Sequence, residues 1–204
     1  MKLKIVGDGS FGSFMKELLA PHFELCEDAD SVMLCVPISA YDAVASKHKD
    51  KHLINVCSVQ KPSTDICLKH SARVSSLHPL FGRRTPAEKR NTIWTYQFTS
   101  TDHDTWFSRD DVEVEFHNLF MNVSRMHMSM NGKIFTPESH DVLMAKTHAS
   151  AVMGAQQLKV FVDRVKDVPD ELIPNSFRLM RDFVKTLEDM PQGTTDSIMA
   201  NPYI

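Results

Sequence analysis

Residues 7 to 12 have the types and the spacing that a phosphate-binding turn needs. They form the pattern G-x-G-x-x-G, made of Gly7, Asp8, Gly9, Ser10, Phe11 and Gly12. In such a turn the first glycine lets the chain reverse sharply, and the second removes a Cβ that would block a pyrophosphate. The third lets the following helix pack closely on the strand. The N-terminus of that helix then offers N–H groups and a partial positive charge to an anion.

The residues on either side of this turn supply the elements that would hold it. A short apolar run precedes it, made of Leu3, Ile5 and Val6. Apolar residues at helical spacing follow it, namely Phe14, Met15, Leu18 and Leu19. This order of strand, turn and helix favours dinucleotide binding over a glycine turn without a ligand.

Candidate site residues follow three further predicted strands. Pro37 ends the strand 31–36, Ser58 follows the strand 52–56, and His78 follows the strand 73–77. Predicted helices at 38–49 and 62–69 separate these strands, which indicates an α/β, doubly wound and mainly parallel sheet. Taken singly, Ser58 reads as a turn residue and His78 as a loop histidine bound to a carbonyl. Together they lie where ligands bind in such sheets, beyond the carboxyl ends of the strands.

The second half of the chain is less regular. Segments 112–116 and 126–130 alternate as strands do, with a helix expected near 117–123 and a hairpin turn at Asn131-Gly132. Helical patterns cover 137–165 and 177–187, and the tail from 191 to 204 is expected to be irregular. We therefore predict a Rossmann-type dinucleotide-binding domain over 1–136 and a helical substrate and dimerisation domain over 137–204.

Composition excludes several classes of protein. The chain has 204 residues and a net charge of -3, with no basic block that would indicate a nucleic-acid partner. No apolar run is long enough for a membrane span, and because the first strand begins at once we expect no signal peptide. The four cysteines lack C-x-x-C spacing, so we expect reduced thiols in a cytoplasmic protein. The ten histidines lack helical H-x-x-x-H pairs, so no metal site is expected.

Several segments together resemble the prephenate/arogenate dehydrogenase family. In chain order they are KIVGDGSFG, DADSVMLCVP, INVCSVQK, SLHPLFG, TPESHDVLMA and PNSFRLMRDF. The resemblance covers nearly the whole chain. It implies an NAD- or NADP-dependent enzyme of tyrosine biosynthesis, which oxidises and decarboxylates the cyclohexadienol prephenate or arogenate.

The resemblance also implies roles for single residues. His78 matches the catalytic histidine, which accepts the proton of the ring hydroxyl. Ser58 matches a serine close to that histidine and the nicotinamide, and Arg178 matches an arginine that binds a substrate carboxylate. Where the family usually has a histidine this chain has Val152, and His148, one helical turn earlier, is either its substitute for substrate binding or an ordinary core histidine. His140 and Asp141 are expected to cap and orient their helix.

The adenosine half of the dinucleotide site departs from the usual pattern. A Rossmann fold places an acid after its second strand to hold the ribose, and Glu27 after Phe23–Leu25 is the candidate. Only Cys26 to Asp30 would then connect this strand to the next parallel strand. A parallel crossover needs about a dozen residues or more. We therefore expect a reduced adenosine half without its crossover helix.

Three functions stay open from the sequence. The first is an active prephenate or arogenate dehydrogenase, and the second is a reduced, non-catalytic relative that binds the dinucleotide weakly. The third, a pyrroline-5-carboxylate reductase-like enzyme, is disfavoured by S-V-Q-K and H-P-L-F-G. A homodimer through the C-terminal helices is also expected, because these helices carry a large apolar set. That set is Leu143, Leu158, Phe161, Phe177, Leu179 and Phe183.

Overall fold

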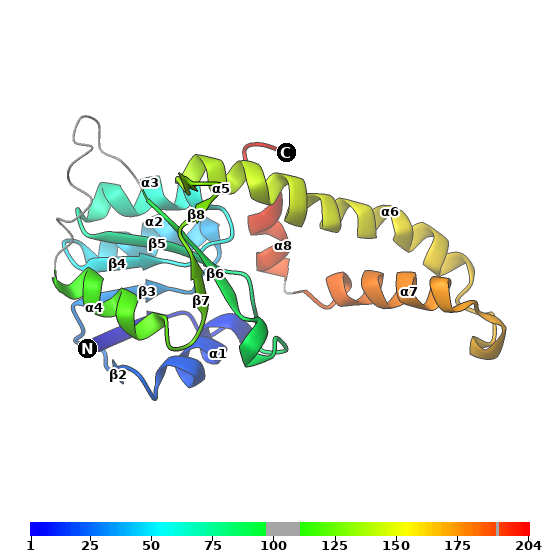
Figure 1. The fold of residues 1–204 in the computed structure, drawn as a ribbon, viewed down its shortest axis with the longest axis horizontal. Helices are drawn as coiled ribbons and strands as arrows, with labels where there is room; N and C mark the ends of the chain where they lie inside the picture. The colour runs from blue at the N-terminus through cyan, green and yellow to red at the C-terminus, as the bar shows by residue number, and fades with distance from the viewer. Residues whose placement is uncertain (97–110, 191) are drawn as a thin grey trace. The chain divides into compact units, whose positions relative to one another are not determined.

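The computed structural model describes residues 1–96, 111–190 and 192–204. Their contacts divide the chain into an N-terminal unit, Met1–Asp141, and a C-terminal unit, Val142–Ile204. The N-terminal unit combines a large sheet with helices, and the C-terminal unit is helical (Figure 1). The dinucleotide-binding and substrate-binding roles expected of the two parts stay predictions.

A seven-stranded sheet in the order β2-β1-β3-β4-β5-β6-β7 is the framework of the N-terminal unit. Its strands are β1 (Lys2–Val6), β2 (Glu24–Leu25), β3 (Ser31–Leu34), β4 (His52–Asn55), β5 (Val74–Pro79), β6 (Asn91–Thr95) and β7 (Arg125–His127). The first five strands run parallel, whereas β6 is antiparallel to β5 and β7 is parallel to β6. The predicted Rossmann-type, mainly parallel sheet is confirmed.

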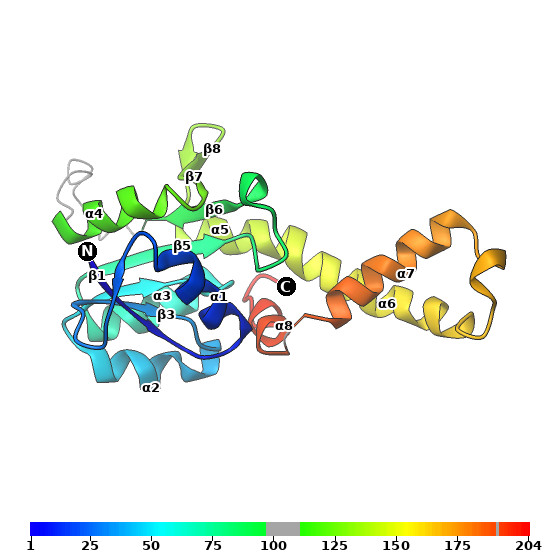
Figure 2. The same cartoon turned by 90° about the horizontal axis from the view of Figure 1, so that it is seen from below.

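Helices cover both faces of this sheet (Figure 1). They are α1 (Ser10–Leu19), α2 (Tyr41–Ala45), α3 (Gln60–His70) and α4 (Asp111–Phe120), with short 3-10 turns η1 (Ile38–Ala40), η2 (Ser46–His48) and η3 (Ala87–Lys89). Helices α1 and α4 share one buried apolar cluster, which includes Phe14, Met15, Phe116 and Phe120. Helices α2 and α3 share another, which includes Tyr41 and Cys67. Figure 2 shows α4 and α2 on opposite sides of the sheet.

The connection from β2 to β3 lacks a helix. β2 pairs with one side of β1 and β3 with the other, and both Leu25 and Ser31 lie opposite Leu3. The chain crosses from one side of β1 to the other within Cys26 to Asp30, which contains no helix. The predicted absence of a crossover helix at this end of the sheet is therefore confirmed.

The prediction of a strand at 112–116 is wrong, because this segment belongs to helix α4. Phe116 and Phe120 are four residues apart, so they share one helix face, and both are buried, with the Phe116 ring against Trp94. The predicted hairpin is confirmed. Strands β8 (Ser129–Met130) and β9 (Lys133–Ile134) flank Asn131 and Gly132, whose φ angles are 52° and 73°.

The C-terminal unit consists of packed helices. A helical path runs through α5 (Pro137–Met144), the π-helical turn η5 (Ala145–Ala149) and α6 (Ser150–Arg164), followed by η6 (Asp170–Leu172), α7 (Asn175–Glu188) and α8 (Gln192–Met199). The irregular tail expected after 191 is wrong, because α8 is ordered by packing of Ile198 in a cluster with Ala149 and Val152. Across the described ranges, no helix has the length and apolarity to cross a bilayer.

Candidate functional site

The glycine turn has the geometry that its sequence predicts. Gly7 has φ +121°, and a Cβ placed on it would lie 2.1 Å from the Cys35 carbonyl oxygen. A Cβ on Gly12 would lie 2.2 Å from the Gly7 carbonyl oxygen, so the start of α1 packs directly on the turn. Side chains are therefore excluded at Gly7 and Gly12 by close backbone approach.

Gly9 differs from the other two glycines because a Cβ there would meet no atom within 4 Å. It precedes α1, whose N-terminus has no side-chain cap. The N–H groups of the first helical turn, from Ser10 to Gly12, consequently lack helical acceptors. The open space at Gly9 and these N–H groups suit an anion such as a pyrophosphate.

Pro37 lies beside this turn. It follows β3, the neighbour of β1, in which Leu34 pairs with Val6. The Cys35 amide donates to the Val6 carbonyl at 2.8 Å, so the two strand ends stay together up to the turn. Pro37 and the glycine turn thus lie at the same carboxyl edge of the sheet, where the sequence predicted a ligand.

Glu27 has a strong partner of its own. Its carboxylate lies 2.9 Å from Lys4 Nζ, and the hydrogen bond from Lys4 holds the pKa of Glu27 below its usual range. The preceding strand β2 ends opposite Leu3, four residues or about 13 Å of strand before Gly7. Glu27 would have to leave Lys4 to hold a ribose, and its cofactor role stays a prediction.

His78 and Ser58 lie at the same carboxyl edge. In the paired strands β4 and β5, Asn55 lies opposite Ser76, so His78 extends past the last residue of β4. Ser58 is half-buried in the turn that joins β4 to α3. His78 is buried, with only 3% of its surface exposed. Parallel pairing therefore carries both predicted residues to one edge, although a catalytic role for either stays a prediction.

A chain of hydrogen bonds links His78 to two residues that the sequence assigned only to capping. His78 Nδ1 lies 2.9 Å from His140 Nε2, and His140 Nδ1 lies 2.8 Å from Asp141 Oδ1. All three side chains are buried. The histidine that the sequence singled out thus belongs to a His–His–Asp series.

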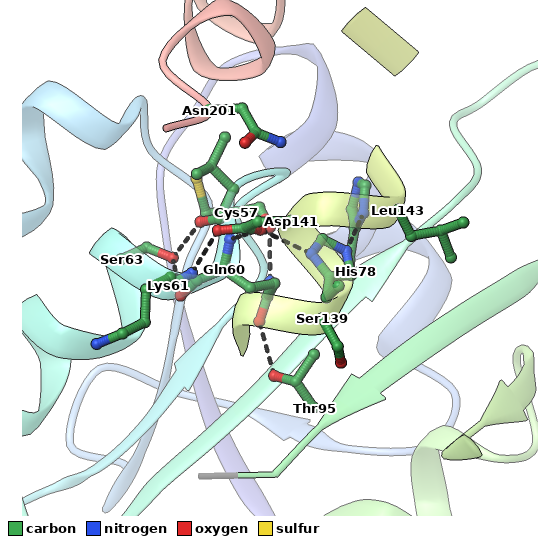
Figure 3. Close-up of polar contacts among 12 residues, drawn as sticks. Cys57, Gln60, Lys61, Ser63, His78, Thr95, Ser139, Asp141, Leu143 and Asn201 are labelled. Atoms are coloured by element: carbon green, nitrogen blue, oxygen red, sulfur yellow. Dashed lines mark hydrogen bonds and ion pairs between the residues drawn. The ribbon is translucent and has the colours of Figure 1, made fainter. Parts of the chain in front are cut away.

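Asp141 anchors this series on the N-terminus of α3. Its carboxylate accepts the backbone N–H groups of Gln60 at 2.7 Å and of Lys61 at 2.8 Å (Figure 3). A buried carboxylate needs such partners, and the positive end of a helix dipole favours its charge. Asp141 was expected to cap its own helix, whereas its carboxylate bonds the first N–H groups of α3, a helix far away in the sequence.

The direction of these hydrogen bonds determines the tautomers of both rings. An ionised Asp141 can only accept, so His140 donates its Nδ1–H. The Nε2 atom of a neutral His140 then carries no proton and accepts the Nδ1–H of His78. His78 is left with its Nε2 unprotonated, the form in which that atom can accept a proton from a hydroxyl group.

Gln60 ties this series to the surrounding loops. Besides its N–H bond to Asp141, its side-chain amide donates to the carbonyls of Cys57 at 2.6 Å and Leu77 at 3.2 Å. Its side-chain oxygen accepts from Thr95 at 3.1 Å (Figure 3). Gln60 thereby supports the residue before His78 and the residue before Ser58 at once. Sequence analysis missed this role, for which the only signal was a polar residue in S-V-Q-K.

Arg178 and His148 belong to the C-terminal unit. Arg178 donates through Nη2 to the Asp170 carbonyl, and the Asp170 carboxylate pairs with Arg181 at 2.6 Å. His148 lies in the π-helical turn η5, a distortion found often at functional sites. Substrate binding by either residue stays a prediction.

Comparison with known proteins finds similar folds among solved structures. No protein-family model and no curated protein matches the chain. Solved structures do match. A candidate prephenate dehydrogenase of Corynebacterium glutamicum superposes with a TM-score of 0.71 at 16% identity, over 98% of this chain and 74% of that one.

Two further solved structures are dehydrogenases that act on these substrates. Prephenate dehydrogenase of A. aeolicus, solved with hydroxyphenyl propionate and NAD+, gives a TM-score of 0.65 at 16% identity, over 98% of this chain and 82% of that one. Arogenate dehydrogenase of Synechocystis gives 0.60 at 13% identity, over 98% and 84%. At these identities the likeness shows a shared fold, that of Rossmann-type dehydrogenases with C-terminal helices.

Proposed function

We propose that this chain is an NAD(P)-dependent oxidoreductase that oxidises and decarboxylates a cyclohexadienol such as prephenate or arogenate. The observation that carries the proposal is the series His78–His140–Asp141, which holds His78 with Nε2 ready to accept a proton. It lies at the carboxyl edge of the sheet, as the glycine turn does. The matched dehydrogenase folds and the resemblance of the motifs support the same activity.

The glycine turn fits the phosphate half of a dinucleotide, because it combines an open Gly9 with an uncapped α1 N-terminus. The N–H groups of Ser10, Phe11 and Gly12 would hold the pyrophosphate, with Pro37 beside it. When bound, the nicotinamide supplies a hydride acceptor. NAD and NADP are both compatible with these residues.

His78 would act on the substrate hydroxyl. Its Nε2 would accept the hydroxyl proton while the carbon that bears the hydroxyl gives up a hydride to the cofactor and becomes a carbonyl carbon. His140 would stabilise the resulting imidazolium by accepting its Nδ1–H, and Asp141 would hold His140 in the required tautomer. After the ring loses carbon dioxide, the proton on His78 can return to the phenolate oxygen, so the base is restored.

Three other residues would bind or orient the substrate in this proposal. Arg178 has the planar, two-pronged donor set that suits a carboxylate. His148 would assist it from the π-helical turn, and Ser58 would orient the reacting hydroxyl or the nicotinamide. Arg178 would exchange its contact with the Asp170 carbonyl for the substrate.

A non-catalytic relative that binds dinucleotide weakly is the second candidate function. The short β2 and the missing crossover helix favour it, because they remove part of the usual adenosine site. The intact series at His78 favours the enzyme.

We also propose a homodimer formed through the C-terminal helices. Of the six apolar residues predicted to cover this interface, none is buried within the chain. Phe161, Leu179 and Phe183 are 51%, 63% and 40% exposed. A second copy would cover this face. Light scattering at micromolar concentration should give twice the mass of the chain, and a stable monomer would rule the dimer out.

Calorimetric titration with NAD and NADP, in the presence and absence of prephenate, separates the two candidate functions. An enzyme should bind at least one dinucleotide, and prephenate should change its affinity, because both ligands would meet at His78. A non-catalytic relative should bind weakly and show no effect of prephenate. Absence of dinucleotide binding would contradict both.

A further inference from the structure

The glycine turn carries an ion pair at its mouth. Lys16 Nζ lies 2.6 Å from Asp8 Oδ1. Asp8 stands within the turn itself, between Gly7 and Gly9, and Lys16 extends from α1. The Asp8 and Lys16 side chains are 91% and 40% exposed, so the pair is accessible to solvent beside the glycine turn.

This pair contributes little to the stability of the turn. Ion pairs between exposed side chains are weak, because water and salt screen them and two flexible side chains must be held in place. The shape of the turn is imposed instead by the contacts of Gly7 with Cys35 and of Gly12 with Gly7. The charges at Asp8 and Lys16 therefore need another explanation.

Asp8 opposes anion binding when it is considered alone. Its hydrogen bond with Lys16 holds the pKa of Asp8 below its usual range, so it is charged at neutral pH. A phosphate at the α1 N-terminus would meet this negative charge. Lys16 supplies the compensating positive charge on a long, flexible stem, and three N–H donors allow it to contact two anions at once.

Lys16 also lies near Glu27, at the end of the sheet where the crossover helix is missing. Together with Lys4 it contributes to the lowered pKa of Glu27. Lys4 and Lys16 each pair with one acid, Lys4 with Glu27 and Lys16 with Asp8, and Asp8 is the acid that belongs to the glycine turn.

We propose that Lys16 is a phosphate-binding residue of the dinucleotide site, held by Asp8 until the ligand arrives. The inference rests on the proposed dinucleotide binding. In the complex, Lys16 binds a phosphate oxygen. This oxygen belongs either to the pyrophosphate or to the 2′-phosphate of NADP. In this arrangement Asp8 lowers the affinity for the dinucleotide, and Lys16 raises it.

The test is titration of NADH and NADPH into the wild type, Lys16→Met, Asp8→Asn and the control Lys2→Met. Lys2 is an exposed lysine of β1 that also faces acids, at 3.8 Å from Glu24 and Asp28. Lys16→Met should weaken binding about tenfold, Asp8→Asn should tighten it severalfold, and Lys2→Met should leave it unchanged.

The two ligands distinguish the two phosphate sources. Equal losses for NADH and NADPH in Lys16→Met assign Lys16 to the pyrophosphate, and a loss confined to NADPH assigns it to the 2′-phosphate. Unchanged affinity for both ligands would overturn the inference, and so would weaker binding in Asp8→Asn, which would mark the pair as structural. If the wild type binds neither ligand, the proposed function itself fails.

Discussion

Replacement of Asp141 by asparagine keeps the size of the side chain and removes its charge. Asp141 accepts three N–H groups, from Gln60, Lys61 and His140, at 2.7 to 2.8 Å. Asparagine has one acceptor oxygen, and its NH2 group can only donate. At least one of the three N–H groups must therefore lose its acceptor or meet another donor.

The catalytic consequence follows from the tautomers. Asp141 Oδ1 accepts from both Gln60 and His140. If the asparagine NH2 takes the place of this oxygen, the Gln60 N–H meets a donor, and His140 Nδ1 must accept, so its proton moves to Nε2. That proton then points at His78 Nδ1, so the proton of His78 moves to Nε2. His78 can no longer accept a proton there, and kcat should fall by about a hundred- to ten-thousandfold. KM for the dinucleotide should change little.

The effect on stability should be moderate. A buried N–H group that loses its acceptor costs about 1–3 kcal/mol. For a chain of this size, Tm should fall by about 2–12 °C, at roughly 2–4 °C per kcal/mol. Activity and thermal melting are measured on the same samples, with Asp65→Asn as control, because Asp65 is a half-exposed carboxylate on α3 paired with Lys61. A folded Asp141→Asn protein with kcat close to that of the wild type would refute this reasoning.

The remaining predictions concern the substrate and cofactor contacts. Arg178→Lys should raise KM for the substrate and leave dinucleotide affinity unchanged, since lysine loses the planar fork; weaker dinucleotide binding would place Arg178 in the other half of the site. Glu27→Ala should leave the affinity for NAD unchanged, because Glu27 pairs with Lys4. A clear loss of affinity for NAD with little loss for NADP would instead show that Glu27 binds the adenosine ribose. Gly9→Ala should fold normally but bind dinucleotide weakly, whereas Gly12→Ala should lower Tm because its Cβ would meet the Gly7 carbonyl. A lower Tm in Gly9→Ala, with weaker binding but an unchanged Tm in Gly12→Ala, would contradict both assignments.

The framework of the fold was predictable because its signals are local. The apolar strand at Lys2–Val6, the glycines after it and the helical repeat in α1 are contiguous, and each follows a known period. The missing crossover helix was also predictable, because the number of residues between β2 and β3 limits what can connect them. Even His78 could be placed, because parallel strands end at a common edge.

The partners of His78 could not be predicted, because they depend on contacts between distant residues. His78 and His140 are 62 residues apart in the chain, and Asp141 reaches Gln60 across 81. In the local sequence, His140 and Asp141 resemble a helix cap. Only tertiary packing brings them to His78 and α3. The first half of α4 and helix α8 were mispredicted for a similar reason, since burial of Phe116 and of Ile198 outweighs local propensity, whereas the helix expected near 117–123 overlaps the end of α4.

The most direct test of the proposed activity is to follow the reduction of NAD and NADP by purified protein with prephenate and with arogenate, in the wild type and in His78→Asn. Formation of the reduced cofactor should equal release of carbon dioxide for one substrate in the wild type. His78→Asn should retain its fold and dinucleotide binding and lose turnover by about a hundredfold or more. Equal turnover in the variant, or a dinucleotide-binding wild type that oxidises neither substrate, would contradict the role assigned to the His78–His140–Asp141 series.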